Sequence, residues 1–196
     1  MKFNTEHFEV AIGYETYHSY AEKLLIKISG DSTNPMRHFA TENLAIMHRV
    51  TKSVQLIEPL QKAIQKSEPL VLLILTEGYC GDSAETFPVF AKMQEMFPDK
   101  VEVKVILRDE HLDVADYYFK TRAIPTVIGL DKQTLNEKFV WGNRPKPAQQ
   151  VMDELKKKKV SIREKGKALH QWYQQDNTLT TQAEIFQLIT NKARTI

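Results

Sequence analysis

The chain has 196 residues, of which 42% are hydrophobic and 27% are charged. This length and composition are typical of one globular domain with extensions, and the apolar share can build a core without a disulfide or metal staple. The formal net charge of +2 is too small to steer the protein strongly toward nucleic acid or an anionic membrane. No stretch approaches the roughly 18 consecutive apolar residues of a membrane span. We therefore expect neither a nucleic-acid nor a membrane partner.

The single cysteine, Cys80, bears on the cellular compartment. One cysteine cannot form a disulfide within the chain, and free thiols are typical of reducing compartments. The N-terminal segment Met1–Glu6 is polar and lacks the apolar stretch of a signal peptide. These observations predict a cytoplasmic location.

The first third of the chain has the pattern of helices. Apolar residues recur at helical spacing between about residues 14 and 66, including Val54, Ile57 and Leu60. The turn-forming cluster Gly30–Pro35 separates the first helix from the second.

The pattern changes at Pro69–Thr76, a short and continuously apolar run. Such a run is typical of a strand buried on both faces. A loop containing Cys80 follows, and then a helical pattern that ends near Pro98. A second strand is expected at Val101–Leu107, and a helical stretch at about Leu112–Phe119.

Two further strands, at Pro125–Leu130 and Lys138–Trp141, are joined by a polar turn. Three helices are then expected, at about residues 146–158, 162–174 and 181–192. Thr181 and Glu184 have the spacing of a capping box, which predicts that the last helix begins there.

The order from residue 69 to 158 is strand–helix–strand–helix–strand–strand–helix. A parallel unit with a helical crossover, followed by a hairpin, predicts a mixed α/β sheet with helices on its faces. This order is the outline of the three-layer thioredoxin fold. We therefore divide the chain into an N-terminal helical extension (1–66), a thioredoxin-like domain (67–158) and a C-terminal helical extension packed on the same core (159–196).

Cys80 is the strongest candidate for chemistry. It follows a buried strand and precedes a helix, so its sulfur should lie near the free N–H groups of the first helical turn. These donors and the helix dipole favour the thiolate, which is the nucleophilic form. The alternative is that Cys80 is a small buried hydrophobe, a common fate of a free cysteine. The flanking Gly78 and Gly81 favour an exposed loop.

Several motifs resemble those of thioredoxins. The segment Tyr79–Ser83, Tyr-Cys-Gly-Asp-Ser, is similar to the aromatic-Cys-Gly-Pro-Cys active-site motif of that family. Ile124–Thr126 matches the Ile-Pro-Thr whose proline is cis and faces the active-site cysteine. Pro88 stands where thioredoxins carry a kinking proline, and Trp141–Gly142 stands where they commonly place a glycine at the end of the hairpin.

Over nearly its whole length the chain also resembles a group of bacterial thioredoxin-like proteins of poorly defined role. Its matches to their motifs are Thr76–Asp82, Arg108–Glu110 and Trp141–Pro145, together with helical extensions at both ends. The resemblance implies that substrate lies beside the sulfur of Cys80 and contacts Tyr79, Gly81, Ile124, Pro125 and Trp141.

Ser83 occupies the position of the second, resolving cysteine of thioredoxins, and a hydroxyl cannot attack a mixed disulfide as a thiolate can. We therefore expect a monothiol redox mechanism. Cys80 would attack a protein or small-molecule disulfide, and glutathione or another low-molecular-weight thiol would release the mixed disulfide. Monothiol glutaredoxins, which carry Cys-Gly-Phe-Ser, are similar at this motif.

Three polar side chains near the motif have more than one interpretation. Ser83 could donate a hydrogen bond to the Cys80 sulfur, or serve only as a suitable first-turn residue of the helix. Asp82 suits the helix dipole but raises the pKa of a nearby thiol, and it could relay a proton. Arg144 could bind an anionic group or be an exposed loop residue without that task.

Two other functions stay open. A binding module without turnover could capture a peptide or client thiol between Cys80 and Pro125. A shared iron–sulfur cluster, by analogy with monothiol glutaredoxins, would use Cys80 from two subunits and two glutathiones. We expect no resident cofactor and no metal site, because no nucleotide fingerprint is present and the six histidines are scattered without ligand spacing.

Overall fold

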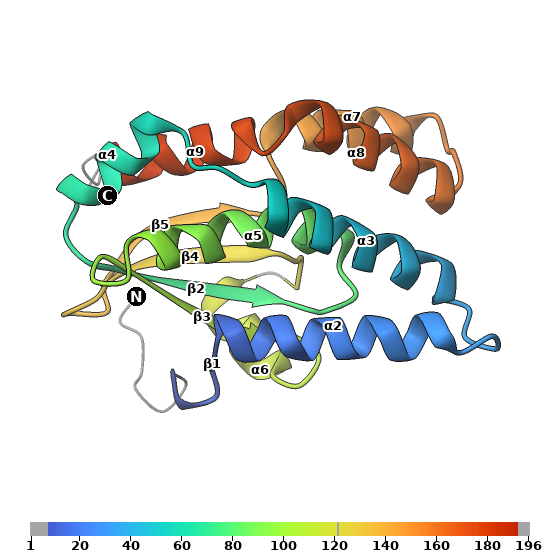
Figure 1. Cartoon of the computed structure of the whole chain (residues 1–196), viewed down its shortest axis with the longest axis horizontal. Helices are drawn as coiled ribbons and strands as arrows, with labels where there is room; N and C mark the ends of the chain where they lie inside the picture. The colour runs from blue at the N-terminus through green and yellow to red at the C-terminus, as the bar shows by residue number, and fades with distance from the viewer. Residues whose placement is uncertain (1–7, 121, 192–196) are drawn as a thin grey trace.

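The computed structural model describes residues 8–120 and 122–191, and a mixed five-stranded sheet stands at its centre (Figure 1). The strands of these residues are ordered β1–β3–β2–β4–β5. In chain order the elements are β1 (Ile12–Gly13), α2 (Tyr14–Gly30), α3 (Arg37–Ser53), α4 (Glu58–Lys66), β2 (Leu70–Thr76), α5 (Gly81–Met96), β3 (Val101–Leu107), α6 (Leu112–Val114), the π-helical turn η1 (Ala115–Phe119), β4 (Thr126–Asp131), β5 (Glu137–Gly142), α7 (Lys146–Lys157), α8 (Ile162–Asp176) and α9 (Leu179–Thr190).

The central strands have the predicted connectivity. β2 and β3 are parallel along their full length, from Leu70 opposite Val101 to Thr76 opposite Leu107. β4 lies antiparallel on the other side of β2, and β5 lies antiparallel to β4. The fold class inferred from the sequence is therefore confirmed. The two-residue β1 was not predicted, because so short a strand has no period to detect.

The apolar run of β2 is buried on both faces because it serves two cores. Leu70, Leu72 and Ile74 face the cluster that contains α5 and the N-terminal helices. The alternate residues face a smaller cluster that includes Val114 and Phe119 of the α6–η1 segment. Alternation along one strand thus joins the two helical layers through the sheet.

The helices before β2 and after β5 pack mainly on the α5 side of the sheet. α3 lies against both α2 and α5, α4 lies against α9, and α7 pairs with α8 (Figure 1). Gln182 joins α9 to the connection between α3 and α4. Its side chain accepts from the backbone N–H of Ile57 at 2.7 Å and donates to the carbonyl of Gln55 at 3.0 Å. Val54 and Ile57 therefore belong to a connection between α3 and α4, although their spacing matched a helix.

The predicted capping box at Thr181 is wrong. α9 begins at Leu179, and Thr181 is buried inside it. Glu184 instead accepts hydrogen bonds from Trp141 Nε1 and from the backbone N–H of Lys146. The Glu184 carboxylate therefore binds residues distant in the sequence and does not cap its own helix. In the described part of the chain, no helix is both long enough and apolar enough to span a bilayer.

Candidate functional site

Cys80 stands directly before the first residue of α5, with an extended backbone (φ −77°, ψ 118°). The approach to this position is tight, because a Cβ at Gly78 would lie 3.0 Å from the backbone of Ala21 in α2. Cys80 is half-buried, and its Sγ donates to the carbonyl of Ile124 at 3.5 Å. The Ile124–Pro125 peptide bond is cis, and Pro125 itself is buried. The structure thus brings the sulfur and the Ile-Pro-Thr segment together.

The surroundings of the thiol oppose ionisation. Burial raises the pKa of Cys80 to about 11, and the Asp82 carboxylate acts in the same direction. The Ser83 hydroxyl and the backbone N–H groups of the first turn lower the pKa, as expected for a helix start. Desolvation of the half-buried sulfur is the largest of these contributions, so it opposes the thiolate that a position at a helix start favours.

Ser83 is part of the link between α5 and the sheet. It is buried, and its Oγ lies 2.5 Å from Oγ1 of Thr76, the last residue of β2. Both hydroxyls are shielded from water, so a hydrogen bond between them satisfies groups that water cannot reach, and the Ser83 hydroxyl also acts on the Cys80 sulfur. Ser83 therefore has two side-chain partners, Thr76 in β2 and the Cys80 sulfur.

Asp82 is neutralised by groups from outside the motif. Arg144 Nε lies 3.1 Å from Oδ1 of Asp82, and Nη2 lies 2.5 Å from Oδ2, a bidentate pair. The Tyr173 hydroxyl donates to Oδ1 at 2.8 Å. Burial and then the Asp82 charge raise the pKa of Tyr173 well above its usual value. Arg144 thus binds an anionic group of this chain, with 14% of its side chain exposed, and the Asp82 carboxylate accepts from both Arg144 and Tyr173.

A second acidic residue of α5 was missed by sequence reasoning. The Glu85 side chain is only 2% exposed, and both of its oxygens accept from Arg49 Nη2 of α3, at 3.1 and 3.2 Å. His170 Nδ1 of α8 lies 3.4 Å from Oε1. The available signal was a carboxylate among apolar residues of a helix that is buried on most sides. A carboxylate in such a place needs a partner.

Tyr79 is bound by the segment after β3. Its hydroxyl donates to Asp109, and Arg108 Nη2 donates to that hydroxyl at 2.7 Å. The backbone N–H of Asp109 donates to the buried Glu77 at 2.7 Å. Burial and the hydrogen bond to Asp109 raise the pKa of Tyr79 to about 12. The Tyr79 carbonyl accepts from Asn43 Nδ2 at 2.8 Å, so both ends of this residue are fixed.

Trp141 and Gly81, which were also expected to contact substrate, lie in different surroundings. The Trp141 side chain is buried, packs edge-on against Phe90 at 5.6 Å, and donates to Glu184 at 2.7 Å. Trp141 therefore belongs to the core between α5 and α9. Gly81 faces the helical extensions, since a Cβ there would lie 3.2 Å from Asn43 Oδ1 and 3.4 Å from His170 Cε1.

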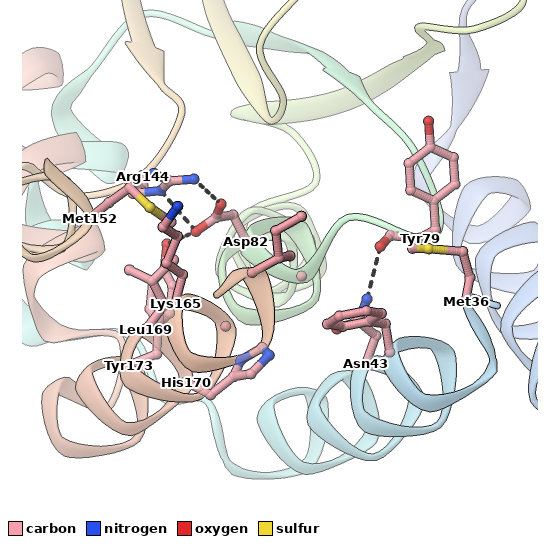
Figure 2. A pocket seen from close by; sticks show the side chains of 14 residues that line it. Met36, Asn43, Tyr79, Asp82, Arg144, Met152, Lys165, Leu169, His170 and Tyr173 are labelled. Atoms are coloured by element: carbon pink, nitrogen blue, oxygen red, sulfur yellow. Dashed lines mark hydrogen bonds and ion pairs between the residues drawn. The ribbon is translucent and has the colours of Figure 1, made fainter. Parts of the chain in front are cut away.

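A cavity of about 450 Å³ lies on this helical side of the motif, between α3, the start of α5 and α8 (Figure 2). Its lining is mostly apolar: Met36, Phe39, Asn43, Tyr79, Gly81, Asp82, Arg144, Met152, Ile162, Lys165, Gly166, Leu169, His170 and Tyr173. The residues on both sides of Cys80 line it, whereas Cys80 does not.

Across residues 8–120 and 122–191, no cluster of three or more His, Cys, Asp or Glu side chains could hold a metal ion.

Comparison with known proteins gives a family and a fold. The family model described as thioredoxin matches residues 30–156. The crystal structure of an HIV epitope scaffold matches with a TM-score of 0.62 and 17% identity, over 96% of this chain and 98% of that one. A protein of unknown function from Pseudomonas aeruginosa matches with a TM-score of 0.63 and 15% identity, over the same shares. No curated protein matches this chain.

Proposed function

Because this chain belongs to the thioredoxin family, we propose that it carries out monothiol thiol–disulfide exchange through Cys80. The observation that carries the proposal is the position of the sulfur. It stands at the start of α5 and 3.5 Å from the carbonyl of Ile124, which precedes the cis proline. An extended disulfide substrate beside that segment would present its S–S bond to the Cys80 sulfur.

The reaction has two exchange steps. The Cys80 thiol first loses its proton to solvent, and the thiolate attacks one sulfur of the substrate disulfide. A Cys80–substrate disulfide forms, the substrate S–S bond breaks, and the other half leaves as a thiolate. An external thiol then attacks this mixed disulfide, so that the second half becomes bound to the external thiol and Cys80 leaves as a thiolate. Ser83 supplies no second thiol, so the external thiol is required.

The test uses 2-hydroxyethyl disulfide as substrate and glutathione as the external thiol. Intact-mass spectrometry should show a mercaptoethanol adduct on the wild-type protein, and glutathione should remove it. Turnover coupled to glutathione reductase should then continue over many cycles. Cys80→Ser should form no adduct and show no turnover above background, because the chain has no other thiol. An unmodified wild-type protein after incubation at pH 9 would refute the proposal.

A binding module is the second candidate, and the burial of the thiol favours it. A thiol whose pKa is about 11 is almost entirely protonated at neutral pH, which slows nucleophilic attack. Such a protein would form one adduct that glutathione releases slowly or not at all. Adduct formation without repeated turnover in the coupled assay would therefore select the binding module over the exchange catalyst.

A further inference from the structure

The cavity beside the Cys80 motif has the size and composition of a small-molecule site. Its volume of about 450 Å³ falls within the roughly 300–1,000 Å³ of typical ligand pockets. One wall comes from the start of α3 and the other from α8. Figure 2 shows Met36 and Asn43 on one side, and Lys165, Leu169 and His170 on the other. Apolar walls contributed by separate elements suit a ligand that enters between them.

The apolar lining continues to the protein surface. Met36 is 43% exposed and Ile162 is 76% exposed, and both line the cavity. Large apolar side chains left in water beside a concave apolar wall are typical of a surface that binds an apolar group. Phe39, Met152 and Leu169 extend this lining.

The charged groups of the lining favour an anion. The charge of Arg144 is balanced by Asp82, with which it forms the bidentate pair. His170 is directed through Nδ1 toward Glu85. Lys165, by contrast, forms no ion pair with any residue in the described ranges, and its side chain lies within the lining. The cavity therefore combines an apolar wall with one uncompensated cation.

We propose that this cavity binds a small amphipathic carboxylate, with an apolar chain between α3 and α8 and the carboxylate beside Lys165. Burial of the chain supplies the main driving force. The ammonium group of Lys165 selects the anion over a neutral molecule of equal length. The site does not use the Cys80 sulfur, so this inference goes beyond the proposed exchange activity and does not depend on it.

The charge requirement is tested by isothermal titration calorimetry with decanoate and decanol, both below their aggregation concentrations. Wild-type protein should bind one decanoate, and more tightly than decanol. Lys165→Met should weaken decanoate about fivefold, the size expected for a partly exposed ion pair, and leave decanol unchanged. Lys167→Met is the matched control, because Lys167 is an exposed α8 lysine outside the lining. Equal effects of the two variants, or equal affinity for decanoate and decanol, would overturn the proposal.

The location is tested by filling the cavity at Gly166. A Cβ at Gly166 meets no atom within 4 Å, so Gly166→Phe can place its ring in open space while replacing a poor helix former. This variant should lose binding of both ligands while its urea midpoint stays close to wild type. Cys80→Ser should bind decanoate as wild type does, which separates this site from the exchange reaction. No detectable decanoate binding by wild type, or unchanged binding by Gly166→Phe, would refute the site.

Discussion

The two sides of the Cys80 motif are held in different ways. On the sheet side, defined by Thr76, Ser83 and Ile124, the contacts are hydrogen bonds between uncharged groups. On the helix side, defined by the partners of Asp82 and Glu85, the contacts are mostly ion pairs, with Arg49 of α3, with His170 of α8 and with Arg144 of the β5–α7 connection.

This difference separates the geometry of the site from its electrostatics. The sheet side lies within the thioredoxin-like domain and fixes where the sulfur stands relative to Ile124. The helix side brings Arg49, Arg144 and His170 to carboxylates in the first turns of α5. Without those cations, the two largely buried carboxylates of Asp82 and Glu85 would remain uncompensated. Arg49 of α3 and His170 of α8 thus supply charge to Glu85 from helices outside residues 67–158, whereas the cation at Asp82 comes from the connection between β5 and α7.

Removing the Arg144–Asp82 ion pair on the helix side of the Cys80 motif should give the largest loss of stability. Arg144→Met removes the cation from Asp82, whose side chain is only 10% exposed, and leaves a buried carboxylate with one hydroxyl donor. We expect a loss of about 3 kcal/mol in the free energy of unfolding, measured by urea denaturation. Lys62→Met, which removes an exposed ion pair with Glu58, is the control and should change stability by less than about 0.5 kcal/mol. Equal stabilities of the two variants would show that the Asp82 pair contributes nothing.

Removing the Thr76–Ser83 hydrogen bond on the sheet side should cost less stability. Thr76→Val leaves the buried Ser83 hydroxyl without its Thr76 partner, and should cost about 1–2 kcal/mol of unfolding free energy. The double variant Thr76→Val/Ser83→Ala replaces both polar groups with apolar ones, so part of that stability should return. Strictly additive losses in urea denaturation of the two single variants and the double variant would argue against a coupled pair.

The smallest expected effect is a shift of the Cys80 pKa when the charge of Asp82 is removed. Asp82→Asn removes a negative charge that raises the Cys80 pKa and leaves Arg144 as an uncompensated cation nearby. Both changes favour the thiolate, so the midpoint of iodoacetamide labelling against pH should fall by about 1 pH unit from the wild-type midpoint. The labelling rate of wild type should still rise above pH 9, because burial holds the thiol protonated there. A midpoint that does not move would assign the raised pKa to burial alone.

The order of helices and strands was accessible from the sequence because it depends on local patterns. The continuous apolar run of β2 predicted a strand between two layers, and both clusters packed against it are present. The error at Thr181 has the same origin, since a capping box is a local signal. The carboxylate of Glu184 was instead engaged by Trp141, which lies 43 positions away.

The sequence by itself determined the α/β framework and the presence of a serine, Ser83, three positions after the single cysteine, because periodicity and residue identity are local properties of the chain. Only the tertiary structure decided how Cys80 is shielded and how Asp82 is neutralised. Arg144 and Tyr173 lie 62 and 91 positions from Asp82, and no spacing rule predicts such pairs. Burial and charge compensation are properties of the packed chain, so the acidity of the thiol could not be inferred from the motif that contains it.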